Sequence, residues 1–169
     1  MENRGKVGIV MGSASDLPVA EKAVAVLRDF SVPYEVHVLS AHRCAQEARE
    51  FALRARESGF FVLIAFAGMA AHLAGALAAA TTLPVIGVPC KGAVLEGMDA
   101  LLSTVMMPPG IPVATVGVDG GKNAALLAVQ MLAMTDGELA QKLAADREAM
   151  RAKALRDGET VREKLEKEL

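Results

Sequence analysis

The chain has 169 residues, a formal net charge of −2 at pH 7, 53% hydrophobic residues and 22% charged residues. This length is typical of one domain with a sizeable core, and the near-neutral charge excludes a general basic surface for nucleic acid. Small residues, mainly alanine, supply much of the apolar share, and aromatic residues make up only 4%. Such a composition favours close packing of helices on a sheet and between subunits, although a general bias towards alanine gives the same numbers.

The N-terminal stretch MENRGKVGIVMG lacks the long apolar segment and cleavage site of a signal peptide. The longest apolar run of the chain is broken by His72, Gly75 and Pro84, so it does not resemble a membrane span. Cys44 and Cys90 lie far apart and match no metal-ligand spacing. We therefore expect a cytoplasmic protein with reduced cysteines, no membrane segment and no bound metal.

Short apolar runs typical of β-strands alternate with helical patterns along the chain. The predicted strands span residues 6–11, 34–39, 60–67, 83–89 and 111–118. The predicted helices span residues 19–30, 45–59, 71–81, 97–107 and 122–134. From residue 135 onwards the chain is charged and helical, and RDGET at 156–160 predicts an interruption of that helix.

This alternation predicts an α/β fold with a flavodoxin-like, doubly wound parallel sheet of about five strands and helices on both faces. We expect a single domain over 1–169, with an α/β core at about 6–134 and a charged C-terminal helical segment at about 135–169. Ligands of such folds bind outside the carboxyl ends of the strands. The loops that follow the five predicted strands are therefore the places where a site is expected.

The loop after the first strand, GSASD, has the chemistry of an anion site. Gly12 permits a sharp turn and a close approach of ligand to backbone, and Ser13 and Ser15 offer hydroxyl groups. The loop amides point towards the N-terminus of the next helix, where phosphate is favoured. Asp16 can cap that helix or accept hydrogen bonds from ribose hydroxyls. Serine and aspartate are also ordinary capping residues, so this loop alone leaves phosphate binding open.

The loop after the second strand, SAHR, combines a cation with a proton carrier. Arg43 presents a planar fork that suits phosphate, and Ser40 adds a further donor. His42 is the side chain best able to give and take a proton near neutral pH. Since a lone histidine is often structural, these residues alone make His42 a candidate and no more.

The loop after the third strand, AGMAAHLAG, is expected to bind a ligand through backbone amides more than through side chains. Gly68 and the small residues after it can bring amides close to a carboxylate or to carbon dioxide. His72, early in the next helix, is either part of a site or bonded to a neighbouring loop or subunit. His37, inside the second strand, is expected to be structural. The three histidines form no metal motif, and neither a nucleophile elbow nor a dinucleotide fingerprint occurs.

Several segments together resemble one known family, the phosphoribosylaminoimidazole carboxylase catalytic subunits of purine biosynthesis. In chain order these are GIVMGSASD, LSAHR, AGMAAHLAG, LPVIGVP, GMDALLSTVMMPPGIPVATV and KNAALLA. The resemblance covers about residues 6–134 and is closer to the class I branch, the N5-carboxyaminoimidazole ribonucleotide mutases. It implies a three-layer α/β/α sandwich and a homo-octamer with sites between subunits.

The resemblance also implies the reaction. N5-carboxyaminoimidazole ribonucleotide, a carbamate, would be isomerised to 4-carboxy-5-aminoimidazole ribonucleotide by decarboxylation and recarboxylation, with no metal and no organic cofactor. Ser13 and Arg43 would hold the 5′-phosphate, Asp16 the ribose hydroxyls, and His42 would be the general acid and base. The Gly68 loop would hold the migrating carboxyl group. The remaining predicted substrate-binding residues are Gly12, Ser15, Ser40, Met69, His72 and Leu73. A transient hand-over of substrate from a carbamate-forming synthetase is a further expectation.

The chain departs from the family pattern at four positions. Ala45 and Ala74 stand where the family usually has prolines, Met69 replaces a glycine, and Met106 replaces a glutamine. Met69 matters most, because it lies in the loop expected to hold carbon dioxide.

Other functions remain as alternatives. The class II branch carboxylates aminoimidazole ribonucleotide directly with carbon dioxide and carries S-A-H-K and A-G-R-S-N at the matching loops, whereas this chain has Arg43 and AGMAAH. A non-catalytic nucleotide- or flavin-binding module is possible on the same fold. His42 beside the phosphate loop and the lack of aromatic residues near the loops argue against that module. Related decarboxylation chemistry on another ribonucleotide is the third alternative.

Overall fold

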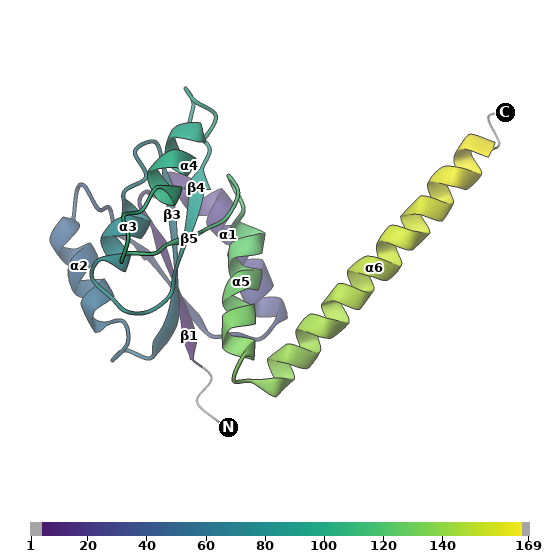
Figure 1. The fold of residues 1–169 in the computed structure, drawn as a ribbon, viewed down its shortest axis with the longest axis horizontal. Helices are drawn as coiled ribbons and strands as arrows, with labels where there is room; N and C mark the ends of the chain where they lie inside the picture. Colours follow the sequence, from purple (N-terminus) through teal and green to yellow (C-terminus); the bar gives the residue numbers. More distant parts are fainter. Residues whose placement is uncertain (1–4, 167–169) are drawn as a thin grey trace.

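The structure is a computed structural model that describes residues 5–166 of the chain. Its strands are β1 (Lys6–Met11), β2 (Tyr34–Val38), β3 (Phe60–Gly68), β4 (Val85–Cys90) and β5 (Ala114–Thr115). All neighbouring strands run parallel, in the order β2-β1-β3-β4-β5 (Figure 1). This is the flavodoxin-like order, so the predicted doubly wound α/β fold is confirmed.

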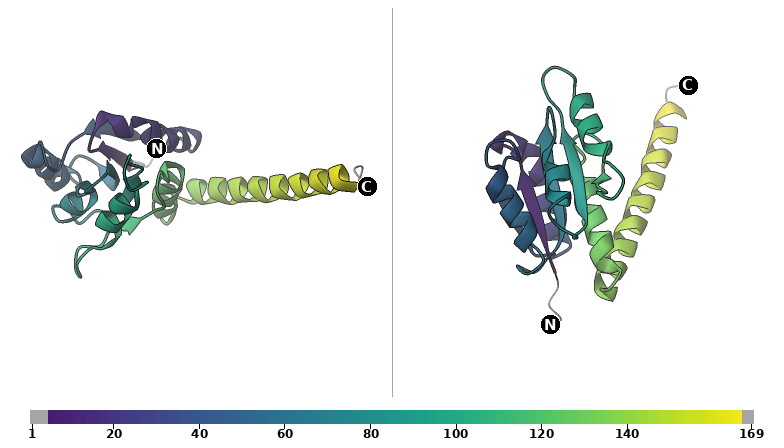
Figure 2. Two further views of the ribbon diagram at one scale, coloured as in Figure 1. Left: turned by 90° about the horizontal axis from the view of Figure 1, so that it is seen from above. Right: turned by 60° about the vertical axis from the view of Figure 1, so that its left-hand side comes forward.

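Helices cover both faces of the sheet and complete a three-layer sandwich (Figures 1 and 2). They are α1 (Leu17–Asp29), α2 (Ala45–Arg54), α3 (Leu73–Ala78), α4 (Met98–Val105), α5 (Gly121–Ala133) and α6 (Gly137–Glu166), with a 3-10 helix η1 (Ala14–Asp16) before α1. α1 and α5 pack together on one face of the sheet, and α2, α3 and α4 pack on the other.

Side chains alternate along the strands and divide the core into two layers. In β1, Val7 and Ile9 face α1 and α5, whereas Val10 faces α2 and α3, and all three are fully buried. Alanines of α1 and α5 lie in the first layer. A Cβ atom at Gly121 would lie 2.2 Å from the carbonyl oxygen of Val19, so the absence of a side chain there allows the two helices to approach closely.

β5 is much shorter than the predicted strand at 111–118, so the extent of that prediction was wrong. Only two residues pair with β4, opposite Ile86 and Gly87. Pro112 has no N–H to donate, which limits pairing at the start of this edge strand. The chain still follows the sheet for one more residue, since the Val116 N–H donates to the Gly87 carbonyl oxygen at 3.1 Å.

The predicted interruption of the C-terminal helix at 156–160 was wrong, because α6 continues through it. Gly158 costs only about 1 kcal/mol relative to alanine inside a helix, which is too little to end a long one. The ion pair between Lys153 and Asp157, at 2.7 Å, spans the turn that precedes this glycine.

α6 projects away from the α/β body, as two different views show (Figures 1 and 2). Leu139 is fully buried against the core and Leu143 packs partly against it. Further along, Met150, Leu155 and Val161 are about half exposed. No helix within the described residues combines the length and apolar character needed to cross a lipid bilayer. Residues 1–4 and 167–169 of the predicted domain lie outside the described residues.

Candidate active site

A cavity of about 620 Å³ opens at the carboxyl ends of β1 to β4. It lies where the strand order reverses, since β1 has β2 on one side and β3 on the other. The Gly12 N–H donates to the Phe66 carbonyl oxygen at 2.9 Å and so ties the loop after β1 to β3. The predicted site residues all line this cavity: Gly12, Ser13, Ser15, Asp16, Ser40, His42, Arg43, Gly68, Met69, His72 and Leu73.

The loop after β1 is held by a reciprocal cap. The Ser13 N–H donates to Asp16 Oδ2 at 3.1 Å, and the Ser15 N–H donates to Ser13 Oγ at 3.3 Å. The Ser15 hydroxyl also donates to Ser13 Oγ, at 2.9 Å. Because the Ser13 oxygen accepts both bonds, its own proton remains available for an anion in the cavity. The capping role and the anion-binding role expected from the sequence are therefore compatible at Ser13.

The loop after β2 is folded around Ser40. The Ser40 N–H donates to Cys44 Sγ at 2.9 Å, and Ser40 Oγ accepts from the backbone N–H of Arg43 at 3.2 Å. Arg43 Nη2 donates to the Gly12 carbonyl oxygen at 3.3 Å, so the guanidinium group bridges the loops after β1 and β2. These contacts use part of the guanidinium fork and place it beside Ser13 in the cavity.

Two histidines meet in the cavity from different strands. The rings of His42 and His72 have centroids 5.3 Å apart and planes inclined by 39°. His42 follows β2, whereas His72 is the N-cap residue of α3. Both side chains are exposed at the cavity surface, where a ligand can reach them. Leu73 differs, since only 2% of it is exposed and it packs in the core between α3 and the sheet.

Met69 adopts a left-handed backbone conformation, with φ 56°. This conformation favours glycine, which explains why the family pattern has a glycine here and why a methionine is unusual. The side chain is 71% exposed, so it lies at the cavity mouth and does not fill the interior. The preceding residue, Gly68, is in close contact with β4, because a Cβ atom on it would lie 3.3 Å from the Cys90 carbonyl oxygen.

Asp16 is a buried carboxyl group in the cavity wall, 8% exposed. Burial raises its pKa above the ordinary value, while hydrogen bonds from the Ser13 backbone and the Cys90 thiol oppose that shift. Burial, together with the charges of Asp16 and Asp119, raises the pKa of Cys90 to about 12. Cys90 is therefore a neutral thiol at physiological pH and does not act as a nucleophile.

Sequence reasoning included the loop after the fourth strand among the expected places but named none of its residues, and Lys91, Gly92 and Ala93 also line the cavity. The Lys91 N–H donates to Asp119 Oδ1 at 2.9 Å, and the Lys91 side chain forms an ion pair with Glu96. The loop after β5 thus reaches the cavity indirectly, through Asp119. The signal in the sequence was a lysine immediately after a predicted strand.

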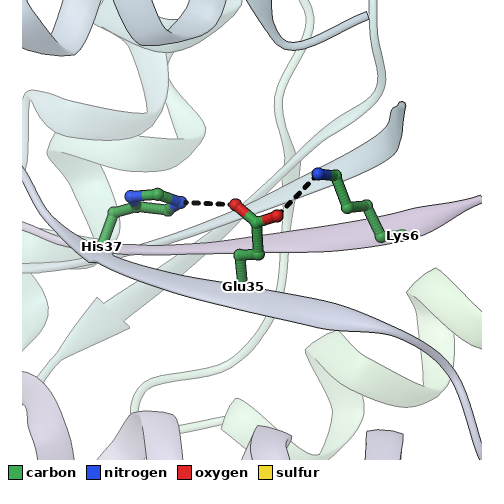
Figure 3. Close-up of polar contacts among 3 residues, drawn as sticks. All are labelled: Lys6, Glu35 and His37. Carbon is green, nitrogen blue, oxygen red and sulfur yellow. Dashed lines mark hydrogen bonds and ion pairs between the residues drawn. The ribbon is translucent and has the colours of Figure 1, made fainter. Parts of the chain in front are cut away.

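His37 lies away from this cavity, on edge strand β2 (Figure 3). Its ring packs on Phe51 with centroids 4.5 Å apart, and Nε2 lies 3.4 Å from Glu35 Oε2. Glu35 Oε1 accepts from Lys6 Nζ at 2.6 Å. This arrangement fits the structural role expected for His37. Within residues 5–166, no group of three or more His, Cys, Asp or Glu side chains is placed to hold a metal ion.

Comparisons with known proteins identify the family to which the chain belongs. The family model described as AIR carboxylase matches residues 6–153. The N5-carboxyaminoimidazole ribonucleotide mutase of Pyrococcus abyssi is 58% identical over 86% of this chain and 84% of its own length. The phosphoribosylaminoimidazole carboxylase of Saccharomyces cerevisiae is 53% identical over 81% of this chain and 24% of its own length. The crystal structure of Treponema denticola PurE matches with a TM-score of 0.81 and 31% identity, over 89% of this chain and 94% of that one. The chain therefore belongs to the AIR carboxylase family.

Proposed function

We propose that this chain is an isomerase that converts N5-carboxyaminoimidazole ribonucleotide to 4-carboxy-5-aminoimidazole ribonucleotide. One observation carries the proposal: a single cavity contains His42, the Ser13 loop, Arg43 and the Gly68 loop. The relative from Pyrococcus abyssi, 58% identical over 146 residues, bears the name of this activity.

The residues divide into a binding end and a reacting end. The 5′-phosphate is bound by Ser13, Ser15, Ser40 and Arg43. These residues lie on two loops that are brought together by the contact of Arg43 with Gly12. Asp16 accepts hydrogen bonds from the ribose hydroxyls. The Gly68 loop, which includes Met69, holds the migrating carboxyl group, and His72 and Leu73 lie close to it. Binding energy from the remote phosphate holds the imidazole ring in position for the reaction.

His42 moves the proton in both halves of the reaction. In its protonated form it gives a proton to the exocyclic nitrogen as the N–C bond of the carbamate breaks and carbon dioxide leaves. The ring carbon then forms a bond to carbon dioxide, and the proton on that carbon returns to the neutral imidazole. The cycle consumes no external proton. Small residues and backbone around Gly68 keep carbon dioxide near the ring and exclude water.

The deciding experiment supplies two substrates side by side. The enzyme is mixed with aminoimidazole ribonucleotide and bicarbonate in one sample, and with N5-carboxyaminoimidazole ribonucleotide made in place by a synthetase in the other. Formation of the 4-carboxylate only from the carbamate supports the mutase. Efficient formation from carbon dioxide at modest concentration supports the direct carboxylase, the activity in the name of the yeast relative. No product in either sample overturns the proposal and points to another substrate, with Met69 and its altered loop as the cause.

We also propose that the chain is one domain that assembles as a homo-octamer, as the family resemblance implies. Apolar side chains exposed on and beside α4 support an assembly: Met98 at 55%, Leu102 at 53% and Met106 at 75%. The projecting helix α6 adds further exposed apolar residues, including Leu155 and Val161. Sedimentation equilibrium tests the octamer, and a monomer at micromolar concentration contradicts it.

A transient hand-over from the carbamate-forming synthetase is proposed because the carbamate is unstable. A catalytically inactive variant added to the coupled reaction slows product formation if substrate passes directly between the two proteins. It has no effect if substrate diffuses through solution.

A cytoplasmic location is likewise proposed, supported by the free thiols of Cys44 and Cys90. Cell fractionation tests it.

A further inference from the structure

Two cationic side chains line opposite sides of the cavity. Arg43 follows the edge strand β2, and Lys91 follows β4, with β1 and β3 between them. Neighbouring strands lie about 4.8 Å apart, so the roots of the two side chains are separated by roughly 14 Å. Long side chains on both sides can therefore reach the two ends of one elongated ligand.

The backbone of Lys91 is fixed, although its side chain is exposed. Its N–H donates to Asp119 Oδ1 at 2.9 Å, and the Asp119 N–H donates to the Pro89 carbonyl oxygen at 2.9 Å. Gly68 pairs in register with Cys90, so Lys91 immediately follows the residue opposite Gly68. The lysine thus extends from a rigid root beside the loop that surrounds the migrating carboxyl group.

The present partner of Lys91 is easily replaced. That partner is Glu96, but both side chains of the ion pair are exposed to solvent, Lys91 by 55% and Glu96 by 68%. Exposed pairs of this kind contribute little to stability, because water and salt screen them. The Glu96 carboxylate raises the pKa of Lys91, so the side chain stays cationic. A ligand carboxylate in the cavity that Lys91 lines can therefore compete with Glu96.

We propose that Lys91 binds the carboxylate of the substrate and of the product, exchanging Glu96 for it. The inference rests on the proposed function, which gives the ligand a phosphate at one end and a carboxylate at the other. Arg43 then binds the phosphate end and Lys91 the carboxylate end. His42 follows the same strand as Arg43, and His72 follows β3, which lies between β2 and β4. Lys91 selects ligands that carry the carboxyl group over the decarboxylated ribonucleotide.

The test compares two ligands that differ only in this group. Binding of 4-carboxy-5-aminoimidazole ribonucleotide and of aminoimidazole ribonucleotide is measured by titration calorimetry on the intact protein. Lys91→Gln is expected to weaken binding of the carboxylate about tenfold, since a charge-assisted hydrogen bond is lost, and to change the affinity for the decarboxylated ligand less than twofold. In Glu96→Gln, carboxylate binding is expected to be unchanged or tighter, because no ion pair of Lys91 has to be broken before the ligand binds. Lys22→Gln, on the outer surface of α1, is the matched control.

Weaker carboxylate binding in Lys91→Gln without weaker binding in Glu96→Gln separates ligand binding from support of the loop. If both variants weaken carboxylate binding equally, the ion pair serves the loop and the proposal is wrong. If Lys91→Gln weakens both ligands alike, or neither, Lys91 does not select the carboxylate and the proposal is also wrong. Wild-type binding of both ligands is measured first. Its absence would overturn the proposed function itself, independently of any variant. Thermal unfolding of each variant confirms that the fold is intact.

Discussion

The rings of His42 and His72 lie with their centroids 5.3 Å apart, although the two residues come from loops after different strands. The parallel order of β2, β1 and β3 brings these loops to the same edge of the sheet. One of the two rings is expected to move the proton and the other to line the site. Mutations separate these roles.

His42→Asn should leave the fold and ligand affinity nearly unchanged and reduce kcat by at least about 100-fold, because general acid–base catalysis contributes 10²–10⁴-fold. His72→Asn should cost much less in kcat, since His72 is not assigned the proton. Steady-state kinetics with the carbamate made in place, together with calorimetric binding of aminoimidazole ribonucleotide, gives both numbers. Normal turnover of His42→Asn would end its assignment as proton carrier.

Arg43→Ala should weaken binding of every ligand that carries the 5′-phosphate, whether or not it carries the carboxyl group. A lost charge-assisted contact costs about 1.5–3 kcal/mol, or roughly 10- to 100-fold in affinity. Arg43→Lys should recover part of this loss but not the contacts of the planar fork with Gly12 and Ser40. Calorimetric titration of the two variants measures the effect, and an unchanged affinity of Arg43→Ala would remove Arg43 from the phosphate site.

Met69→Gly should stabilise the fold. The left-handed backbone of Met69, φ 56°, costs about 1–2 kcal/mol for a residue with a side chain. Glycine relieves that strain but adds about 0.5–1 kcal/mol of unfolded-state entropy. The expected net gain is about 0.5–1 kcal/mol in the free energy of unfolding, measured by denaturant titration. Ala70→Gly, at a neighbour whose φ is not positive, is the control and should destabilise the fold. A loss of stability in Met69→Gly would show that packing of the side chain outweighs the strain.

The arrangement of the cavity follows from rules that can be applied to the sequence. Strands end where apolar runs meet small polar residues, and parallel strands bring these ends together. Ser13, His42, Arg43 and Gly68 could therefore be assigned to one site from the sequence alone. The boundaries of β1 and the flavodoxin-like class of the parallel sheet followed from the same patterns.

Features that depend on tertiary contacts could not be obtained in this way. The link from Lys91 to Asp119 joins loops after different strands, and no local pattern indicates it. Met69 lies between β3 and α3 and has a positive φ. This conformation is unfavourable for a residue with a side chain, so no pattern in the sequence indicates it. The short β5 reflects the missing N–H of Pro112 at the start of an edge strand, whereas in α6 the surrounding helix overrides the weak helix preference of Gly158.

Asp16 gives a pH dependence of known sign. Its pKa in the folded state is raised by burial, so its contribution to stability is fully present below the ordinary value of 3.8 and is lost as pH rises through the raised pKa. Asparagine can still accept the Ser13 N–H without the cost of a buried charge. The unfolding free energy of wild type minus that of Asp16→Asn should therefore fall between pH 3.5 and pH 7. A difference that is flat or rises with pH would contradict the raised pKa.

Glu35 gives the opposite pH dependence on edge strand β2 (Figure 3). The hydrogen bond from the Lys6 ammonium group is the main cause that lowers the pKa of Glu35 below 4.5. Its contribution to stability is therefore present above pH 4.5 and is lost as pH falls through the lowered value. Because the pair is partly exposed, Glu35→Gln should cost no more than about 1 kcal/mol at pH 7, and 1 M salt should reduce that cost. Denaturant titrations at pH 7 and pH 3 measure it, with Glu21→Gln on α1 as the matched control. A cost for Glu35→Gln that is equal at both pH values would mean that the carboxylate charge does not stabilise this edge of the sheet.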